Sequence, residues 1–529
     1  MTETALHRAT PPLESPEVYP FSAPFSAFDF VESRFGGCRS IRRAFSLARS
    51  TGKCRTLVIE RIDLNGLLAE ENEELASLGF FGGRDVFRVS FWQSTFSCPD
   101  SIAKLLSKDL IGYFIAKRDG KTEGTARWYV FESVFRKYDH PHNCVSRPTK
   151  YVLNVGEKQF SVQGVLYCQQ NGLNKACAHV ALRSILSRMV PDGDVSYSCI
   201  NTIASKVPGC INQKPSEGLS TEQIKAVLDA FKIPHCDMDY DAAEAKGIQD
   251  IRHIHPYQND LYAGVESGYG ALLGFRLGDP IRPVSRHIIP FYGHTFNKDT
   301  WVTDAENFYF NIGGGAGYVP SVNWTSSFIG HDDNFGSNFC VPRLYVRPEQ
   351  VDYVAAIYPH GVNLMGSDIA LLALPILSEL YPAMPSGNKW LSRLKVAFSG
   401  PVPQVVFRTV CIETTKYFDK LAECRDWDGH SEAADLVAVF RKARFPKWIQ
   451  VVEVSLPQLF AANERKLGDI VFDAEHPLRY VGSDISKTPF LFARLPGAYF
   501  MLDLKSGREN RFSAFPSLIK AHVPVLTEL

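Results

Sequence analysis

Short apolar blocks rich in β-branched and aromatic residues alternate with polar blocks of helical length over the first 150 residues. A polar block at 65–78 predicts a helix, and four apolar blocks predict strands at 56–62, 87–92, 112–117 and 128–135. Asp119-Gly120, between the last two blocks, is typical of a hairpin turn. We therefore expect a small α/β domain over residues 25–150. The proline-rich residues 1–24 before it are expected to be a disordered tail.

The pattern changes at about residue 151, where two predicted helices come before a set of strands. Apolar residues recur at helical spacing from Val180 to Met189, and Asn174 precedes them as a typical N-cap residue. A second helix is predicted at 218–228, because Ser220 and Gln223 have the spacing of a capping box. We interpret residues 151–345 as one domain.

The last third of the chain alternates again. It predicts a helix at 368–380 and strands at 404–411, 449–454 and 490–502. We interpret residues 346–529 as a second α/β accessory domain.

Charge and cysteine usage narrow the classes of partner. Lys plus Arg and Asp plus Glu both total 57, and the basic residues are dispersed among acids, which argues against a nucleic-acid surface. The 12 cysteines include no CxxC pair, so we expect reduced thiols and a cytoplasmic location. The first residues lack the apolar core of a signal peptide, and no apolar run is long enough to span a bilayer. We therefore expect neither a nucleic acid nor a membrane as a partner.

Cys177 is the first residue with candidate chemistry. It falls at about the third position of the predicted helix, where unpaired N–H groups and the helix dipole favour a thiolate. A cysteine is more often a small buried residue than a nucleophile, so its position alone does not decide its role. A second segment favours the interpretation of Cys177 as a nucleophile. In this segment His287 opens an apolar strand that ends at Gly293. A base on a strand edge, facing the start of a helix, has the geometry that activates a thiol.

These segments resemble those of papain-like cysteine peptidases. Residues 287–294 look like the histidine strand of that superfamily, H-x5-G followed by a ring, and residues 169–182 look like its nucleophile helix. The likeness is nearest to the branch with the bacteriocin-processing (double-glycine) peptidases of ABC transporters. Residues 218–228 fit the second helix of that branch, and 265–273 fit the strand before the histidine strand.

The resemblance covers residues 160–345 and implies an α+β fold, with a helical lobe and an antiparallel sheet. The two α/β accessory domains would then flank this papain-like domain. The resemblance also implies that Cys177 is the nucleophile and His287 its base.

The third catalytic member has several candidates. In the family, an Asn or Asp orients the histidine, and Asp332-Asp333-Asn334-Phe335-Gly336 resembles the Asn-Ser-Trp-Gly turn that carries it. We favour Asp333, keep Asp332 as its neighbour, and place Asp304, 17 residues after His287, third. Residues 297–324 would then be an insertion. Alternatively, the paired acids simply cap a turn.

The oxyanion donor departs from the family pattern, in which a glutamine lies about six residues before the cysteine. Gln170 lies seven residues and Gln169 eight residues before Cys177. A bulge at Gly172 would absorb the difference, so we favour Gln170, together with the N–H of Cys177.

Other residues with ligand chemistry have no second cluster at zinc spacing, so we expect neither a metal nor another cofactor. They are His140, His142 and Cys144, and the pair His253 and His255. We expect His179 to be a packing or polar surface residue and His294 to line the sheet. The glycines at 313–317 are expected to form a loop.

The function implied by the resemblance is that of a cysteine hydrolase. It would cleave a peptide or isopeptide amide bond in a peptide or protein substrate, through a Cys-His-Asp triad and a thioester acyl-enzyme. Three alternatives stay open: a transamidase or acyltransferase on the same fold, a catalytically silent binding module, and a domain that cleaves only its own chain. The accessory domains could recruit a protein partner. The sequence does not decide the substrate, the oligomeric state or the biological process.

Overall fold

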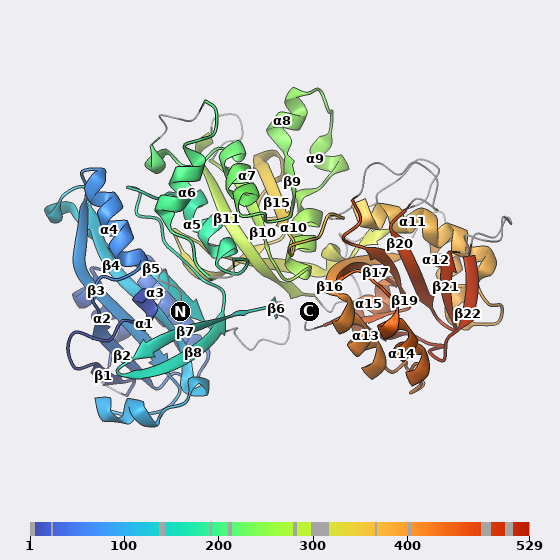
Figure 1. Ribbon diagram of the computed structural model, residues 1–529, viewed down its shortest axis with the longest axis horizontal. Coiled ribbons are helices and arrows are strands. Elements are labelled where there is room, and N and C mark those ends of the chain that lie inside the picture. The colour runs from blue at the N-terminus through green and yellow to red at the C-terminus, as the bar shows by residue number, and fades with distance from the viewer. Residues whose placement is uncertain are drawn as a thin grey trace.

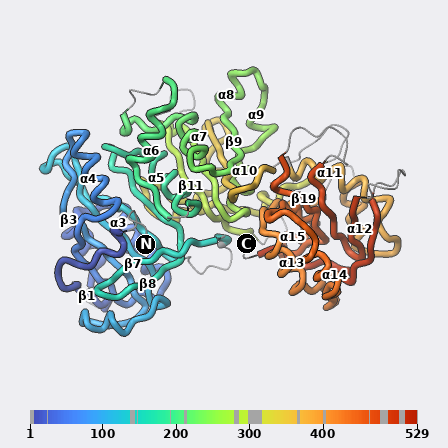
Figure 2. Tube along the Cα trace, viewed as in Figure 1, coloured from blue at the N-terminus to red at the C-terminus, as the bar shows by residue number. Residues whose placement is uncertain are grey.

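The computed structural model describes residues 6–22, 25–136, 143–145, 147–190, 193–209, 214–278, 283–297, 317–364, 368–399, 404–477, 488–502 and 512–527. Within these ranges the chain has a mixed α/β fold of three units in a row, each built on a mainly antiparallel sheet (Figure 1). The trace shows the N-terminal unit at one end, the C-terminal unit at the other, and the middle unit between them (Figure 2).

The N-terminal unit is a five-stranded antiparallel sheet in chain order. Its strands are β1 (Glu17–Pro20), β2 (Thr56–Arg61), β3 (Phe81–Trp92), β4 (Leu110–Gly120) and β5 (Arg127–Phe135). One face packs against α2 (Ala27–Phe35) and α3 (Arg39–Ser50) through an aromatic core. The other face packs against α4 (Leu67–Ser77) and the hairpin β7 (Thr149–Val155) and β8 (Lys158–Gly164). The four predicted strands and the predicted helix are confirmed.

The expected turn at Asp119-Gly120 is wrong. Both residues belong to β4, and residues 121–126 make the connection to β5. Asp119 is buried, and its two carboxylate oxygens accept hydrogen bonds from Lys117 Nζ at 2.7 and 2.9 Å. This ion pair explains how an acid can be buried inside a strand, because the free-energy cost of burying a carboxylate is smaller when a cation is paired with it.

The expectation of a disordered tail over residues 1–24 is also wrong for residues 6–22. These residues form α1 (Leu6–Ala9) and strand β1, which pairs with β2. Arg8 is buried and donates to Glu132 Oε1 at 2.8 Å and to Asp194 Oδ2 at 2.6 Å. The proline-rich composition hid this order, because the segment is fixed by strand β2 and by Glu132 and Asp194, which all lie outside its local sequence.

The middle unit has a sheet in the order β14-β13-β11-β10-β15-β9, and β6 (Asn143–Val145) also pairs with β11. Its other strands are β9 (His235–Asp239), β10 (Ala271–Gly278), β11 (Pro283–Phe296), β13 (Thr325–Asp332), β14 (Gly336–Pro342) and β15 (Val351–Ile357). Its helices are α5 (Cys177–Leu186), α6 (Tyr197–Ala204), α7 (Thr221–Ala230), α8 (Tyr240–Ala245), α9 (Ile251–Ile254) and α10 (Tyr257–Glu266). Helices α5 and α7 pack on one face of the sheet and α10 on the other.

Of three expectations for the middle unit, one is confirmed and two need correction. The capping box of Ser220 and Gln223 at the start of α7 is confirmed. The strand expected at 265–273 begins only at Ala271, because Val265 and Glu266 end α10. The expected boundary at residue 345 falls too early, since β15 pairs with both β10 and β9 of the same sheet.

The C-terminal unit has a sheet in the order β12-β16-β17-β19-β20-β21-β22, with a small separate pair, β18 (Arg465–Lys466) and β23 (Val523–Pro524). The sheet strands are β12 (Val319–Pro320), β16 (Val406–Glu413), β17 (Trp448–Ser455), β19 (Gly468–Asp473), β20 (Phe490–Leu495), β21 (Ala498–Leu502) and β22 (Phe512–Pro516). The helices are α11 (Asp368–Leu380), α12 (Lys389–Ser399), α13 (Thr414–Glu423), α14 (Ala434–Lys442) and α15 (Pro457–Asn463). The predicted helix at 368–380 and the three predicted strand regions are confirmed.

None of the helices in the described ranges combines the length and the apolar character needed to cross a lipid bilayer.

The buried position of Arg8 leads to a test of the N-terminal segment. Replacement Arg8→Met would leave Glu132 and Asp194, whose side chains are 0% exposed, without one of their cations. We expect the free energy of unfolding to fall by about 3–5 kcal/mol, the usual loss when one member of a buried ion pair is removed. Chemical denaturation followed by circular dichroism measures it.

Arg34→Met is the matched control, because Arg34 pairs with Glu17 at side-chain exposures of 37% and 45%. An exposed pair contributes at most about 1 kcal/mol. Equal losses for the two variants would contradict the buried role of Arg8.

Candidate active site

Cys177 is the first residue of α5 and is half-buried. The expected third helical position is wrong, because the helix begins at Cys177 with Ala176 as its N-cap. In the described part of the chain, the backbone N–H groups of Cys177 and Ala178 donate no hydrogen bond, as is usual in a first helical turn. The thiol therefore lies beside free backbone donors and the positive end of the helix dipole.

Asn174 does not cap α5, because its side chain fixes the loop before Cys177 instead. Asn174 Nδ2 donates to Glu74 Oε2 at 2.7 Å and so ties the loop to α4 of the N-terminal unit. Asn171 Oδ1 accepts the N–H groups of Leu173 and Asn174 at 3.0 and 3.3 Å. The loop that presents Cys177 is thus held from both inside and outside the middle unit.

His179 caps the start of α5 from within. Its Nδ1 accepts the N–H of Ala176 at 3.2 Å, and its Nε2 lies 2.7 Å from Asn201 Oδ1. Burial, helped by the charge of Lys175, lowers the pKa of His179 to about 4, so the ring is neutral and donates through Nε2. His179 therefore fixes the position of the start of α5, where Cys177 lies.

Lys175 is a buried cation two residues before Cys177. Its Nζ forms an ion pair with Glu71 of α4 and lies over the rings of Tyr129 and Tyr197, at 4.7 and 4.4 Å from their centroids. Burial raises the pKa of Glu71, but the charges of Lys117 and Lys175 outweigh it and bring that pKa down to about 2. The carboxylate therefore stays ionised and holds Lys175 in place.

His287 lies in β11, and its buried imidazole connects Cys177 to two acids. The Nε2 atom is 3.5 Å from Asp332 Oδ1 and 3.3 Å from Asp333 Oδ1. Cys177 lines the same cleft as His287, and its thiol lies close enough to the ring to raise the pKa of the imidazole. Since Nε2 is turned to the carboxylates, Nδ1 is the nitrogen available to the thiol. The structure thus brings four of the five predicted site residues into one contiguous cluster.

The charges in this cluster hold a proton near the imidazole. Burial lowers the pKa of His287, but hydrogen bonds to Asp332 and Cys177 and the charges of both acids raise it to about 10. Burial and the neighbouring charge of Asp332 raise the pKa of Asp333 to about 7, although the charge of His287 opposes this. An imidazolium is therefore the favoured form around neutral pH, as a thiolate–imidazolium pair requires.

The two acids have different surroundings. Asp332 Oδ1 also accepts the N–H groups of Asn334 and Phe335 at 2.8 and 3.3 Å, so Asp332 does cap a turn. Asp333 Oδ2 is buried and has no hydrogen-bond partner in the described residues. Asp333 thus has fewer competing contacts than Asp332 for holding the imidazole. Asp304, the third candidate, lies outside the described residues.

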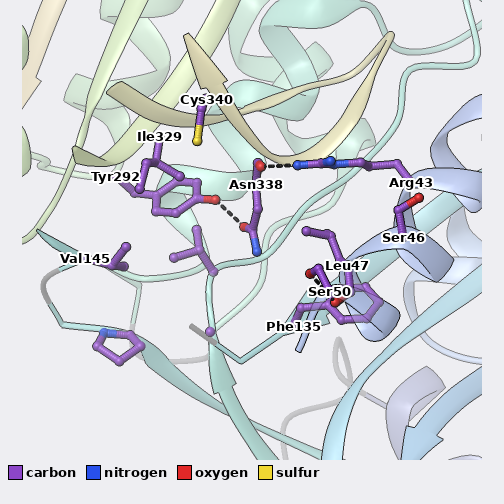
Figure 3. Close-up of a pocket in the computed structure, with 13 residues that line it drawn as sticks. Arg43, Ser46, Leu47, Ser50, Phe135, Val145, Tyr292, Ile329, Asn338 and Cys340 are labelled. Atoms are coloured by element: carbon purple, nitrogen blue, oxygen red, sulfur yellow. Dashed lines mark hydrogen bonds between the residues drawn. The ribbon is translucent and has the colours of Figure 1, made fainter. Parts of the chain in front are cut away.

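The N-terminal unit also supports this turn. Tyr167 Oη, hydrogen-bonded to Ser40 Oγ of α3 at 2.9 Å, donates to Asp333 O at 3.4 Å. Arg43 of α3 donates to the backbone oxygens of Ser337 and Asn338 at 3.1 and 2.5 Å, as Figure 3 shows for Asn338. Helix α3 therefore fixes the turn that carries both acids.

A cavity of about 480 Å³ lies next to these contacts, between α3 and the strands β11, β13 and β14. Figure 3 shows residues that line it. Its walls are mainly apolar and include Leu47, Phe135 and Ile329. Cys177 and His287 are not among its lining residues.

Gln170 does not reach the oxyanion position by any described contact. Its Nε2 lies 3.4 Å from Asn334 Oδ1, which places it beside the acid-bearing turn. Gln169 is occupied elsewhere, because its Oε1 accepts the N–H of Val130 at 2.9 Å. The role of Gln170 as an oxyanion donor stays a prediction.

A cleft of about 630 Å³ opens at Cys177 and His287. It runs between the N-terminal end of α7 and the edge of the sheet formed by β9, β10 and β15. A cleft of this size suits several residues of an extended peptide.

A cation could also bind this cluster, since His287, Asp332 and Asp333 each offer a ligand atom within 4.8 Å of the others. Such a cation would occupy the Nε2 side of the ring, away from the thiol. Two of the other histidines singled out have protein partners: His294 Nε2 lies 2.5 Å from Glu266 Oε1, and His255 Nε2 lies 2.5 Å from Asp260 Oδ2. His140 and His142 lie outside the described residues.

Sequence reasoning missed most of the positioning residues. Even His179, three residues after the N-cap Ala176, had no local signal, because alanine has no side-chain acceptor for a capping box. Glu71, Glu74 and Arg43 act from a different unit, so no local pattern could connect them with Cys177 or the acids.

Comparisons of this chain with protein-family models, with curated proteins and with solved structures gave no match. The likeness to papain-like peptidases therefore rests on the motifs and on the geometry of the site.

The raised pKa of His287 predicts how stability depends on pH. Its folded-state pKa of about 10 lies above the ordinary 6.5, so its contribution to stability is complete below about pH 6.5 and is lost as the pH rises toward 10. We expect a fall of up to about 1.4 kcal/mol per pH unit in the free energy of unfolding, absent from His287→Gln. Denaturation between about pH 7.5 and 9.5, in a Cys177→Ala background that removes the thiol, measures this slope.

His179→Gln is the matched control, because the lowered pKa of His179 affects stability only between about pH 4 and 6.5. That variant should keep the slope of its parent above pH 7. If His287→Gln also keeps the slope, His287 does not hold a proton in the folded state.

Proposed function

We propose that this protein is a cysteine hydrolase that cleaves an amide bond in a peptide or protein, and that its middle unit is a papain-like domain. One observation carries the proposal: Cys177, at the start of a helix, lies in one cleft with His287, and two acids lie at the Nε2 atom of that histidine. A nucleophile, a base and an orienting acid in this order are what thiol catalysis requires.

The reaction would proceed in two stages. The Cys177 thiolate attacks the amide carbonyl carbon, a C–S bond forms, and the C–N bond breaks as His287 gives its proton to the leaving amine. Water then attacks the thioester while His287 accepts a proton, and the carboxylic acid product leaves with the thiol restored. Asp333, with Asp332 beside it, would stabilise the imidazolium and hold its ring in place.

Negative charge on the carbonyl oxygen needs donors near Cys177. The free N–H groups of Cys177 and Ala178 at the start of α5 are suited to this role. Gln170 would join them only after a movement of its side chain away from Asn334.

The transferase alternative differs only in the second stage, where an amine or alcohol would replace water. The silent-module alternative differs in the first stage of the reaction, because a binding domain has no need of an activated thiol. Labelling of the thiol therefore separates the silent module from both enzymes, and product analysis separates the two enzymes.

The first test is selective alkylation by iodoacetamide at about pH 6, with the labelled sites mapped by mass. Burial raises the pKa of both Cys54 and Cys411 to about 12, so these thiols should react slowly. Cys98 is exposed and serves as an internal standard. We expect Cys177 to react about 100-fold faster than Cys98, because an ordinary thiol is less than about 1% ionised at that pH.

His287→Ala should abolish this difference, while His179→Gln should reduce it less. Chelation by EDTA should leave it unchanged, since the proposed chemistry involves no metal. A rate at Cys177 no faster than at Cys98 would contradict the proposed function and favour the binding module.

The roles of the two acids can be separated by their amides. At about pH 8, above the pKa of about 7 of the Asp333 carboxyl, Asp333→Asn removes a negative charge beside the imidazole and should lower the alkylation rate of Cys177 by about tenfold. It should also move the alkaline limb of the rate–pH profile to lower pH, because the imidazolium loses support.

Asp332→Asn keeps an oxygen that can accept the N–H groups of Asn334 and Phe335, so its effect on the profile should be smaller. A larger shift for Asp332→Asn would assign the orienting role to Asp332 instead.

A further inference from the structure

The floor of the cleft beside Cys177 is a row of residues across four adjacent strands. Ile288 of β11 pairs with Gly274 of β10, Gly274 pairs with Tyr353 of β15, and Tyr353 pairs with Asp239 of β9. Directly paired residues share one face of a sheet, and all four line the cleft. The floor therefore runs from an apolar end beside His287 to a carboxylate at the sheet edge.

Gly274 lies in the middle of this row. A Cβ at Gly274 would come within 3.0 Å of Asp352 Oδ1 and 3.3 Å of the Tyr353 Cβ. The missing side chain therefore lets the carboxylate of Asp352 lie close to the floor of the cleft.

The lining of the cleft is strongly acidic. It contains five carboxylates and a single guanidinium, that of Arg286; the acids are Glu217, Glu222, Asp239, Asp241 and Asp352. Burial and the charge of Asp241 raise the pKa of Asp352, although the nearby arginines oppose this. Like charges are therefore crowded at this end of the cleft.

Only part of this charge is neutralised within the chain. Asp241 pairs with Arg252 and Arg286, each at 3.2 Å, and with Arg276, and Arg286 also reaches Asp352 at 3.3 Å. Within the described residues, Glu217, Glu222 and Asp239 form no salt bridge. Lys225, the cation closest in sequence to Glu222, is paired with Asp237 at 2.6 Å.

The start of α7 would otherwise attract an anion, because a helix N-terminus carries partial positive charge. Here Glu222 lies in its first turn and Glu217 lies just before its N-cap, Ser220. These two carboxylates offset the dipole, so this wall of the cleft also favours a cation.

The distance along the floor sets which part of a substrate the acids can meet. Three strand intervals of about 4.8 Å separate Ile288 from Asp239, or roughly 14 Å in all. An extended peptide rises about 3.3 Å per residue, so the acids lie within reach of side chains up to about four residues from the scissile bond.

We infer that the cleft selects basic peptide segments, with a lysine or arginine side chain within about four residues of the bond that Cys177 attacks. The inference rests on the proposed function, because it concerns the same site. Acidic segments are disfavoured by the unpaired carboxylates of the cleft.

The test uses tetrapeptide acyloxymethyl ketones, which alkylate an activated thiol irreversibly. Lysine, glutamine or glutamate is placed in turn at each position, with alanine elsewhere, and the rate of modification of Cys177 is followed by mass. At one position or more, the lysine probe should react about tenfold faster than the glutamine probe, and the glutamate probe more slowly than both. High salt should reduce the lysine-to-glutamate ratio.

The double variant Glu217→Lys/Glu222→Lys should lower the lysine-to-glutamate ratio by about fivefold or more. The lysine and glutamate probes are compared on the same variant. A general loss of thiol reactivity therefore lowers both rates equally and leaves their ratio unchanged. Glu123→Lys is the control, since Glu123 is exposed and lies in the N-terminal unit, outside the cleft lining. It should keep the wild-type ratio.

Iodoacetamide labelling tests the proposed function, and the peptide probes test the preference for basic segments. If iodoacetamide labels Cys177 in a His287-dependent way but the lysine and glutamate probes react equally, or no peptide probe reacts, the inference is overturned and the proposed function stands. If Cys177 shows no His287-dependent labelling at all, both are overturned.

Discussion

The architecture depends on buried ion pairs that join the N-terminal unit to α5, the helix that carries Cys177. Glu132 of β5 binds Arg183 of α5 as well as Arg8 of the N-terminal segment, and Glu71 of α4 binds Lys175. A buried charge loses its solvation by water, and this cost is offset only when a partner of opposite charge is well placed. The N-terminal unit and α5 therefore pack favourably only where these ion pairs form. The start of α5, and with it the thiol, is therefore placed by a part of the chain that contributes nothing to the lining of the cleft.

The same dependence explains what the sequence could and could not predict. Local patterns were sufficient for the strands of the N-terminal unit and for the capping box at Ser220 and Gln223, because propensity and neighbouring residues decide such elements. The start of α5 was misplaced because Glu74, about 100 residues earlier, takes the side chain of the expected N-cap, Asn174. The order of residues 6–22 was missed for the same reason, since Glu132 lies far along the chain.

The candidate site shows a related division. The pairing of Cys177 with His287, and the choice of the turn at Asp332 and Asp333, came from a resemblance in short motifs, and the described geometry brings these four residues together. The sequence could not predict the different surroundings of the two acids. These surroundings depend on the backbone of the turn, whose N–H groups at Asn334 and Phe335 donate to Asp332 Oδ1. Gln170, chosen by spacing alone, lies beside that turn rather than at a described oxyanion position.

The C-terminal unit is attached where it leaves the cleft unobstructed. It meets the middle sheet near Ala356 and Tyr358, which pack with Cys411 and Trp448, whereas the cleft lies toward the opposite ends of the same strands, near Gly274 and Asp352. A second contact, from Arg408 to Glu266 at the end of α10, lies on the face of the sheet opposite to α5 and α7. Both flanking units thus brace the middle unit from outside the cleft. Within the described residues, the lining of the cleft beside Cys177 comes from the middle unit, and the proposed selection of a basic substrate would therefore depend on the acids of that unit.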